Sequence, residues 1–218
     1  MGVITDNLDI WSQALVGTLV LFFAGGALAL VLGIIVGAMR VSPVPIARGV
    51  GTFYVSAIRN TPLTLVFFAF VFALPPLLGL RLTGDVSLTL GICALGIYTA
   101  TYVAEAIRSG VNTVPVGQAE AARALGLSFG QVMSLVVLPQ AFRSVIPPMM
   151  SVFIALLKNT TVAAGFSIVN LGSVRNYLSE RGENAFVVIL WVMVIFVALV
   201  LLLSWVQRTL ENRWRVAR

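Results

Sequence analysis

The sequence predicts an all-α membrane protein that crosses the bilayer with five helices in a single domain, residues 1–218. Hydrophobic residues make up 59% of the chain and charged residues only 10%, whereas about a quarter of a soluble domain is charged. The apolar residues also fall into five runs, each about long enough to cross a bilayer. The fourth contains Lys158, and the others are uncharged except at their edges. One long polar stretch, 115–139, interrupts the runs, and it is the only such stretch that is not suited to lipid.

The five expected spans follow these runs closely. The first is rich in glycine, which either allows close helix packing or is simply tolerated in lipid. Segment 40–59, which follows it, is polar enough to lie on the membrane surface, partly as a helix. Pro62 and Pro75 mark the edges of the second span, and the fourth is expected to open near Pro147 and Pro148. The spans are 14–39, 60–80, 86–107, 144–165 and 184–207.

The distribution of basic residues predicts the orientation of these spans. With the N-terminus outside, ten basic residues face the cytoplasm and three face outward, as cytoplasmic loops favour. The ten are Arg40, Arg48, Arg59, Arg108, Arg123, Arg143 and four arginines of the C-terminal tail. This orientation places the C-terminus and the loop 109–140 in the cytoplasm. Because the basic residues follow membrane topology, the net charge of +6 does not indicate nucleic-acid binding.

The polar stretch itself predicts two short helices joined by a sharp turn. Pro115 suits the first turn of a helix, and Gly126 suits its C-terminal end. Glu120 and Arg123 are three residues apart and can pair on one helix face. The many alanines between them leave the first helix with little side-chain bulk, so that it could enter a tight cleft on another protein.

A second helix is expected to begin at Ser128, which forms a capping box with Gln131. Apolar residues from Val132 onward give it one hydrophobic side, and Pro139 is expected to end it. The alternative is an amphipathic hairpin that lies at the membrane surface without any partner.

This stretch resembles the EAA loop of bacterial ABC importer permeases. The match consists of Glu120-Ala121-Ala122, then Gly126 after three residues, then Val136 and Leu138-Pro139; the family usually has isoleucine where Val136 stands. The resemblance implies the type I ABC importer permease fold, in which this cytoplasmic coupling loop docks into a groove on a separate ATPase subunit. The residues expected to couple the two subunits are Gln118, Glu120, Ala121, Ala122, Arg123, Leu125 and Gly126.

Two further motifs resemble the polar amino acid permeases within that family. Arg59-Asn60-Thr61-Pro62-Leu63 is similar to their RGTPL signature, with Asn60 in place of glycine. Lys158-Asn159-Thr160-Thr161 is similar to their LKNTT stretch, and both forms are closest to glutamate-type permeases of actinobacteria. Where many relatives have Gly-Asn, this chain has Met150-Ser151. The resemblance implies a location in the bacterial plasma membrane and three partners: ATPase subunits, a second permease copy or paralogue, and an external substrate-binding protein.

Polar residues of these motifs are the candidates for a substrate pathway. Lys158 lies roughly 16 Å along a helix from Pro147, near the middle of the bilayer, where a charge needs a partner or a wet path. It either attracts a substrate carboxylate or pairs with another helix. Arg59 either caps the cytoplasmic end of the second span or gates the pathway. The full candidate set is Arg59, Asn60, Thr61, Lys158, Asn159, Thr160 and Thr161.

The composition argues against catalysis by this chain. It contains no histidine and one cysteine, Cys93, which removes most metal sites and any disulfide within the chain. Its only lysine follows Leu157 rather than the glycine of a P-loop. We therefore expect no cofactor or metal here, and ATP and Mg²⁺ bound by the partner ATPase. An ion-coupled carrier acting alone would need carboxylates within the membrane, and Asp85 and Glu105 lie only at span edges.

Overall fold

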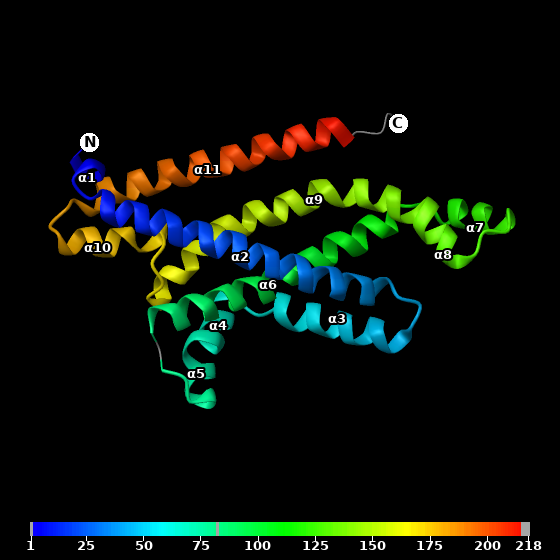
Figure 1. The fold of residues 1–218 in the computed structure, drawn as a ribbon, viewed down its shortest axis with the longest axis horizontal. Helices are drawn as coiled ribbons and strands as arrows, with labels where there is room; N and C mark the ends of the chain where they lie inside the picture. Colours follow the sequence, from blue (N-terminus) through cyan, green and yellow to red (C-terminus); the bar gives the residue numbers. More distant parts are fainter. Residues whose placement is uncertain (1, 82, 215–218) are drawn as a thin grey trace.

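The computed structural model describes residues 2–81 and 83–214, and all of the regular structure in these residues is helical (Figure 1). The long helices lie roughly side by side along the long axis of the molecule. The elements are α1 (Gly2–Thr5), α2 (Leu8–Val41), α3 (Pro45–Arg59), α4 (Leu63–Phe68), η1 (Ala69–Ala73), α5 (Leu74–Leu78), α6 (Gly84–Asn112), α7 (Val116–Ala124), α8 (Phe129–Gln131), η2 (Val132–Val137), α9 (Leu138–Asn159), η3 (Thr160–Phe166), η4 (Leu171–Ser173), α10 (Val174–Glu180) and α11 (Ala185–Trp214).

Four helical stretches of the described residues are long and apolar enough to cross a membrane: Leu8–Val41, Gly84–Asn112, Phe129–Phe166 and Ala185–Glu211. A fifth span is formed if α3 and the helical segment Leu63–Leu78 are counted together, although the two are bent by 99°. The all-α membrane fold expected from the sequence is confirmed.

The glycines of α2 allow it to pack closely on its neighbours. A Cβ atom added at Gly33 would lie 2.4 Å from Cγ1 of Val103 on α6, and one added at Gly17 would lie 2.0 Å from the carbonyl oxygen of Val169. Both distances are shorter than van der Waals contact. At these two positions, close packing rather than tolerance by lipid explains the glycine.

The second expected span differs from the single run 60–80. The chain forms α3 first, breaks at residues 60–62, and resumes as α4, a π-helical turn (η1) and α5. Pro62 lacks an N–H and disfavours a helical conformation at Thr61, which explains why α3 ends at Arg59. Segment 40–59 does not form a separate surface layer either. Helix α3 packs against α2 and α6, and the Tyr54 hydroxyl donates to the carbonyl of Ile97 at 2.7 Å.

The helix that contains the fourth expected span is longer than the sequence predicted. Helix α8, the π-helical η2 and α9 follow one another without a break, so Pro139 does not end the helix and Pro147 and Pro148 lie inside it. A π-helical turn directly precedes Pro139, where the regular hydrogen-bond pattern is already shifted. Membrane helices tolerate internal prolines because neighbouring groups satisfy the freed carbonyls.

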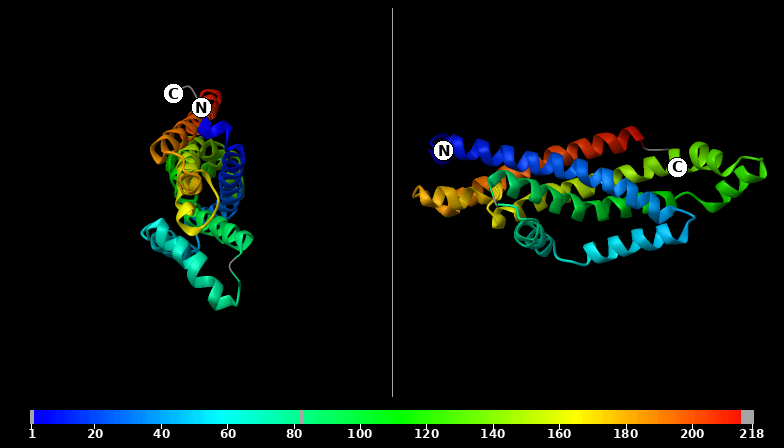
Figure 2. Two further views of the ribbon diagram at one scale, coloured as in Figure 1. Left: turned by 90° about the vertical axis from the view of Figure 1, so that its left-hand side faces the viewer. Right: turned by 60° about the horizontal axis from the view of Figure 1, so that its bottom comes forward.

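The two ends of the bundle are formed by different parts of the chain. Figure 2 shows the N-terminus and α10 at one end, and the connection between α6 and α9, which contains α7, at the other. Leu171, Val174, Leu178 and Val188 are buried at the first end together with Trp11. A larger apolar core lies along the middle of the bundle. It is centred on Leu21, Phe67, Leu95, Leu156 and Phe166.

Candidate functional site: the hairpin and the central cavity

Helix α7 packs against a small hydrophobic cluster of its own. Ala122 is 7% exposed and clusters with Val132 and Val137 of η2. This contact holds α7 against the start of the long helix that leads into α9, so the two helices form a compact hairpin (residues 113–137). Of the residues expected to couple to an ATPase, Ala122 is therefore the one that faces inward.

The remaining surface of α7 is open. Glu120, Ala121 and Arg123 are exposed, and Leu125 at the C-terminal end of the helix is 83% exposed. Gly126 has φ = +85°, a left-handed conformation that favours glycine, and it reverses the chain toward Ser128. A helix with one buried alanine and an exposed opposite face can be inserted into a groove of another protein without unfolding.

Polar contacts within the hairpin agree with most of the local expectations. The capping box of Ser128 and Gln131 is present, and the amide of Gln140 donates to Gln118 at 2.6 Å. The expected pair between Glu120 and Arg123 is not found among the described residues. Instead, the guanidinium of Arg123 lies 6.0 Å from the ring centre of Phe129 on the next helix, because the turn at Gly126 brings that ring close.

An ion cluster fastens the half of α6 that leads into the hairpin. Glu105 accepts from Arg108, whose Nε lies 3.2 Å away, and it also pairs with Arg40 of α2. The Glu105–Arg108 pair was expected from its spacing. The contribution of Arg40, which is 65 residues away in the sequence, was not. The side chain of Arg40 is only 11% exposed, so this cluster ties α2 to α6 from within.

A polar cavity of about 400 Å³ lies in the middle of the bundle, between α6 and α9. Tyr98, which lines it, is the central residue of α6, 14 residues from both Gly84 and Asn112. Polar side chains at the middle of a membrane span are costly and usually functional. The lining residues are Tyr98, Thr99, Tyr102, Ser151, Val152, Ala155, Leu156 and Asn159.

Several polar groups at this cavity are available to a ligand. The hydroxyls of Tyr98 and Tyr102 lie 3.0 Å apart. The Thr99 hydroxyl is buried and has no hydrogen-bond partner among the described residues. The guanidinium of Arg59 lies 5.1 Å from the ring centre of Tyr102. Arg59 therefore ends α3 next to a residue that lines the cavity, and its side chain is exposed.

The structure brings together only some of the expected pathway residues. Asn159 lines the cavity, and Arg59 lies next to it through Tyr102. Thr160 is buried, and its hydroxyl donates to the carbonyl of Leu157 at 2.6 Å, within the helix.

The other pathway candidates lie outside the cavity lining. Thr61 donates to Ala57 at 2.9 Å, and Thr161 donates to Lys158 at 2.8 Å, both through their hydroxyls. Asn60 and Lys158 are exposed. Within the described parts of the chain, Lys158 has no ion-pair partner.

The cavity residues of α6 and α9 carry a signal in the sequence that went unused. Tyr98 and Tyr102 are four residues apart, and so are Ser151, Ala155 and Asn159, so each set forms a stripe on one helix face. A polar or small stripe within an apolar span would have indicated a pathway on each helix. Only the tertiary structure shows that the two stripes face one another.

The hairpin and the cavity are directly connected. Helix α6 lines the cavity and leads into α7, and the long helix that follows α7 lines the opposite wall. Helix α7 is therefore part of the segment that joins the two cavity walls.

Comparisons with known proteins place this arrangement among membrane transporters. Residues 29–216 match the family of the binding-protein-dependent transport system inner membrane component. The chain is 43% identical over 164 residues to the glutamate transport system permease protein GluC of Corynebacterium efficiens, covering 72% of this chain and 71% of that protein. It is 36% identical over 213 residues to the probable glutamine ABC transporter permease protein GlnM of Bacillus subtilis, covering 98% and 97%.

Solved structures show the same fold. An amino acid ABC transporter crystallised with histidines superposes with a TM-score of 0.89 at 26% identity, over 96% of both chains. The MetNI methionine ABC transporter in an inward-facing conformation superposes with a TM-score of 0.80 at 21% identity, over 95% of this chain and 97% of that one.

Proposed function

Starting from the fact that this chain belongs to the family of binding-protein-dependent transport system inner membrane components and is an ABC amino acid permease subunit, we propose that it imports an acidic amino acid of the glutamate type. A separate ATPase supplies the energy and binds ATP and Mg²⁺. The chain lies in the bacterial plasma membrane with its N-terminus outside and its hairpin in the cytoplasm.

One observation supports this proposal more than any other: α7 is the connection between the two helices that line the central cavity. The exposed face of α7, with Glu120, Ala121 and Leu125, docks into a groove on the ATPase. Closure of two ATPase subunits around ATP then moves the hairpin, and the buried contact of Ala122 transmits that movement to η2 and α9. The walls of the cavity shift relative to one another, which alternates the access to it.

The polar groups of the cavity support an amino acid as its ligand. A guanidinium binds a carboxylate with paired hydrogen bonds, and Arg59 is held beside the cavity by Tyr102. The tyrosine hydroxyls and the Asn159 amide can accept from an ammonium group, and the Thr99 hydroxyl can donate to a carboxylate. Glutamate offers two carboxylates and one ammonium group. GluC, at 43% identity, is named for glutamate transport, which favours the same substrate.

A second permease copy or a paralogue is needed to complete the pathway. The cavity is open on one side, and Lys158 lies exposed near it. A second subunit covering this surface would bring Lys158 into a shared pathway, where its charge attracts an acidic substrate. A substrate-binding protein would dock at the opposite end of the bundle, near α10. Cysteine labelling tests this orientation. In a variant in which Cys93 has been replaced and Leu125→Cys supplies the new thiol, only reagents that enter the cytoplasm should react.

A carrier that works alone by ion coupling has less support. None of the described cavity residues is a carboxylate that could bind a coupling proton or cation. Glu105, the nearest acidic residue along α6, is already paired with two arginines. Copurification separates the two functions, because the importer must retain an ATPase and the carrier need not.

The decisive experiment measures uptake in cells that express the whole complex. A panel of unlabelled amino acids competes with labelled glutamate, and we expect glutamate and aspartate to compete best. Arg59→Gln should raise KM about tenfold, as expected for the loss of a hydrogen bond to a charged group. Arg59→Lys keeps the positive charge and should raise KM less. Arg48→Gln, on the same helix but away from the cavity, is the control. Stronger competition by a neutral or basic amino acid would overturn the choice of substrate.

A further inference from the structure

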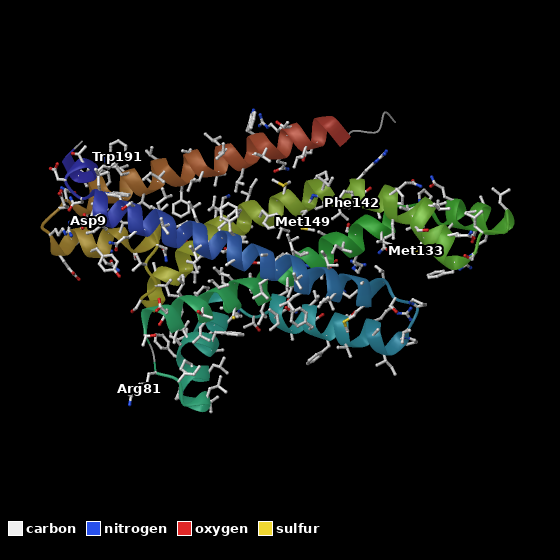
Figure 3. The ribbon with its side chains drawn as sticks, viewed as in Figure 1. Asp9, Arg81, Met133, Phe142, Met149 and Trp191 are labelled. Atoms are coloured by element: carbon white, nitrogen blue, oxygen red, sulfur yellow. The ribbon has the colours of Figure 1, made fainter. Side chains whose placement is uncertain are left out.

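A second, apolar groove lies between the central cavity and the hairpin, and the transport mechanism does not use it. It has a volume of about 960 Å³ and is open along one side. Figure 3 labels two of its lining residues, Phe142 and Met149 of α9. Its lining residues are Leu30, Ile34, Ile107, Val111, Leu138, Pro139, Ala141, Phe142, Arg143, Val145, Ile146, Met149, Met150 and Leu210.

We propose that this groove binds an anionic phospholipid, with the acyl chains along α9 and the phosphate at Arg143. Arg143 is the single charged residue of the lining. It has no ion-pair partner within the described parts of the chain. Its side chain is exposed, so the guanidinium can reach a phosphate at the end of the groove. Basic pockets between membrane helices on the cytoplasmic side bind anionic lipid head groups.

The position of the groove matches one leaflet of the bilayer. The residues that line it come from the half of each helix next to the hairpin: Leu30 and Ile34 of α2, Ile107 and Val111 of α6, and Leu210 of α11. An acyl chain would therefore enter from the leaflet on the hairpin side. The flexible side chain of Arg143 can extend toward the head groups of that leaflet. Arg208 lies two residues before Leu210 and adds positive charge to the same end of α11.

The length and lining of the groove suit lipid. Its lining extends from Leu138 to Met150 on α9, which is about 18 Å of helix. That length is comparable to one leaflet of a hydrocarbon core about 30 Å thick. Apart from Arg143 the lining is almost wholly apolar, which suits acyl chains.

The test uses the assembled permease–ATPase complex in phosphatidylcholine vesicles that contain a small amount of phosphatidylglycerol with a photoreactive acyl chain. Illumination should label peptides that include Met149 or Ile107. Unlabelled phosphatidylglycerol should reduce this labelling in the wild-type protein, and unlabelled phosphatidylcholine should not. Because this comparison needs no variant, it remains valid if the variants below fail to assemble.

Variants then test each part of the site. Met149→Trp fills the groove and should remove the labelling, whereas Met193→Trp, on the exposed surface of α11, should leave it unchanged. Arg143→Gln should lower the labelling by phosphatidylglycerol about fivefold, and Arg48→Gln should not. Equal labelling by photoreactive phosphatidylcholine, or labelling confined to other surfaces, would overturn the proposal. So would a disulfide formed between Met149→Cys and a cysteine placed on a helix of the second permease, because that would show a protein in the groove.

Discussion

At the end of the bundle that holds the N-terminus, polar side chains bind one another, whereas at the hairpin end the chain leaves its functional groups exposed. Asn7 is 4% exposed and accepts from Arg181 at 2.9 Å while it donates to Glu183 at 3.0 Å. These contacts fasten the first residues to the loop before α11. At the other end, Val116 is 72% exposed and Leu125 is 83% exposed.

This difference distinguishes polar residues that stabilise the fold from polar residues that are exposed for a partner. The N-terminal end satisfies its own hydrogen bonds, so its residues contribute to stability. The side-chain contacts of the hairpin, such as its capping box and the Gln118–Gln140 contact, are local and exposed, and exposed apolar residues such as Leu125 indicate a partner surface. Substitutions should therefore affect stability at one end and coupling at the other.

The largest expected effect is on the ion cluster at the base of the hairpin. Arg40→Met removes a nearly buried cation from Glu105 and should cost about 2 kcal/mol of stability, because Arg108 remains as a partner. Thermal unfolding of the purified complex measures this. Asp9→Asn weakens the Asp9–Arg181 pair at the other end, where both side chains are about half exposed, keeps the contact of Arg181 with Asn7, and should lower the melting temperature less. A larger loss for Asp9→Asn would contradict the comparison.

A matched pair of glycines sharpens the comparison further. Gly126 and Gly182 have nearly the same backbone conformation, with φ values of +85° and +83°, and both have open space around an added Cβ. Valine at either position should cost roughly 1–2 kcal/mol of backbone strain. Only Gly126→Val should lower glutamate uptake, about tenfold if the strain displaces α7. Uptake and ATP hydrolysis are measured in parallel. Equal uptake by the two variants would contradict the assignment of the hairpin as the coupling element.

The smallest expected effects come from two side-chain amides. Asn7→Ala removes the buried amide and should lower stability by about 1 kcal/mol without changing uptake. Gln118→Ala removes an exposed contact of the hairpin with Gln140. It should leave the melting temperature unchanged and raise the amount of ATP hydrolysed per glutamate imported. The reverse pattern, with uptake sensitive to Asn7 and stability to Gln118, would show that the two ends had been assigned wrongly.

The hairpin could be predicted in detail because its signals are local. The capping box joins Ser128 to Gln131, three residues away, and Gly126 ends its own helix. Such contacts depend on the order of neighbouring residues and little else. The prediction that Pro139 ends the helix was wrong, because the helix continues through Pro139 after a π-helical turn that no sequence pattern indicated.

The central cavity could be predicted only in part. Of the expected pathway residues, Asn159 lines the cavity and Arg59 contacts its lining residue Tyr102, but Lys158 does not line it. Tyr98, Tyr102 and Ser151 were missed as lining residues. Their position depends on how α6 packs on α9, and that packing joins residues about 50 positions apart.

The sequence by itself determined the class of protein, the approximate spans and the hairpin, because hydrophobicity and helix capping act over short stretches of chain. Only the tertiary structure decided that α3 breaks beside Tyr102, that Arg40 reaches Glu105, and that faces of α6 and α9 line one cavity. Those outcomes depend on close contact between distant segments. In a membrane, where lipid surrounds every apolar face equally well, such contacts are selected by shape and by polar pairing rather than by hydrophobicity.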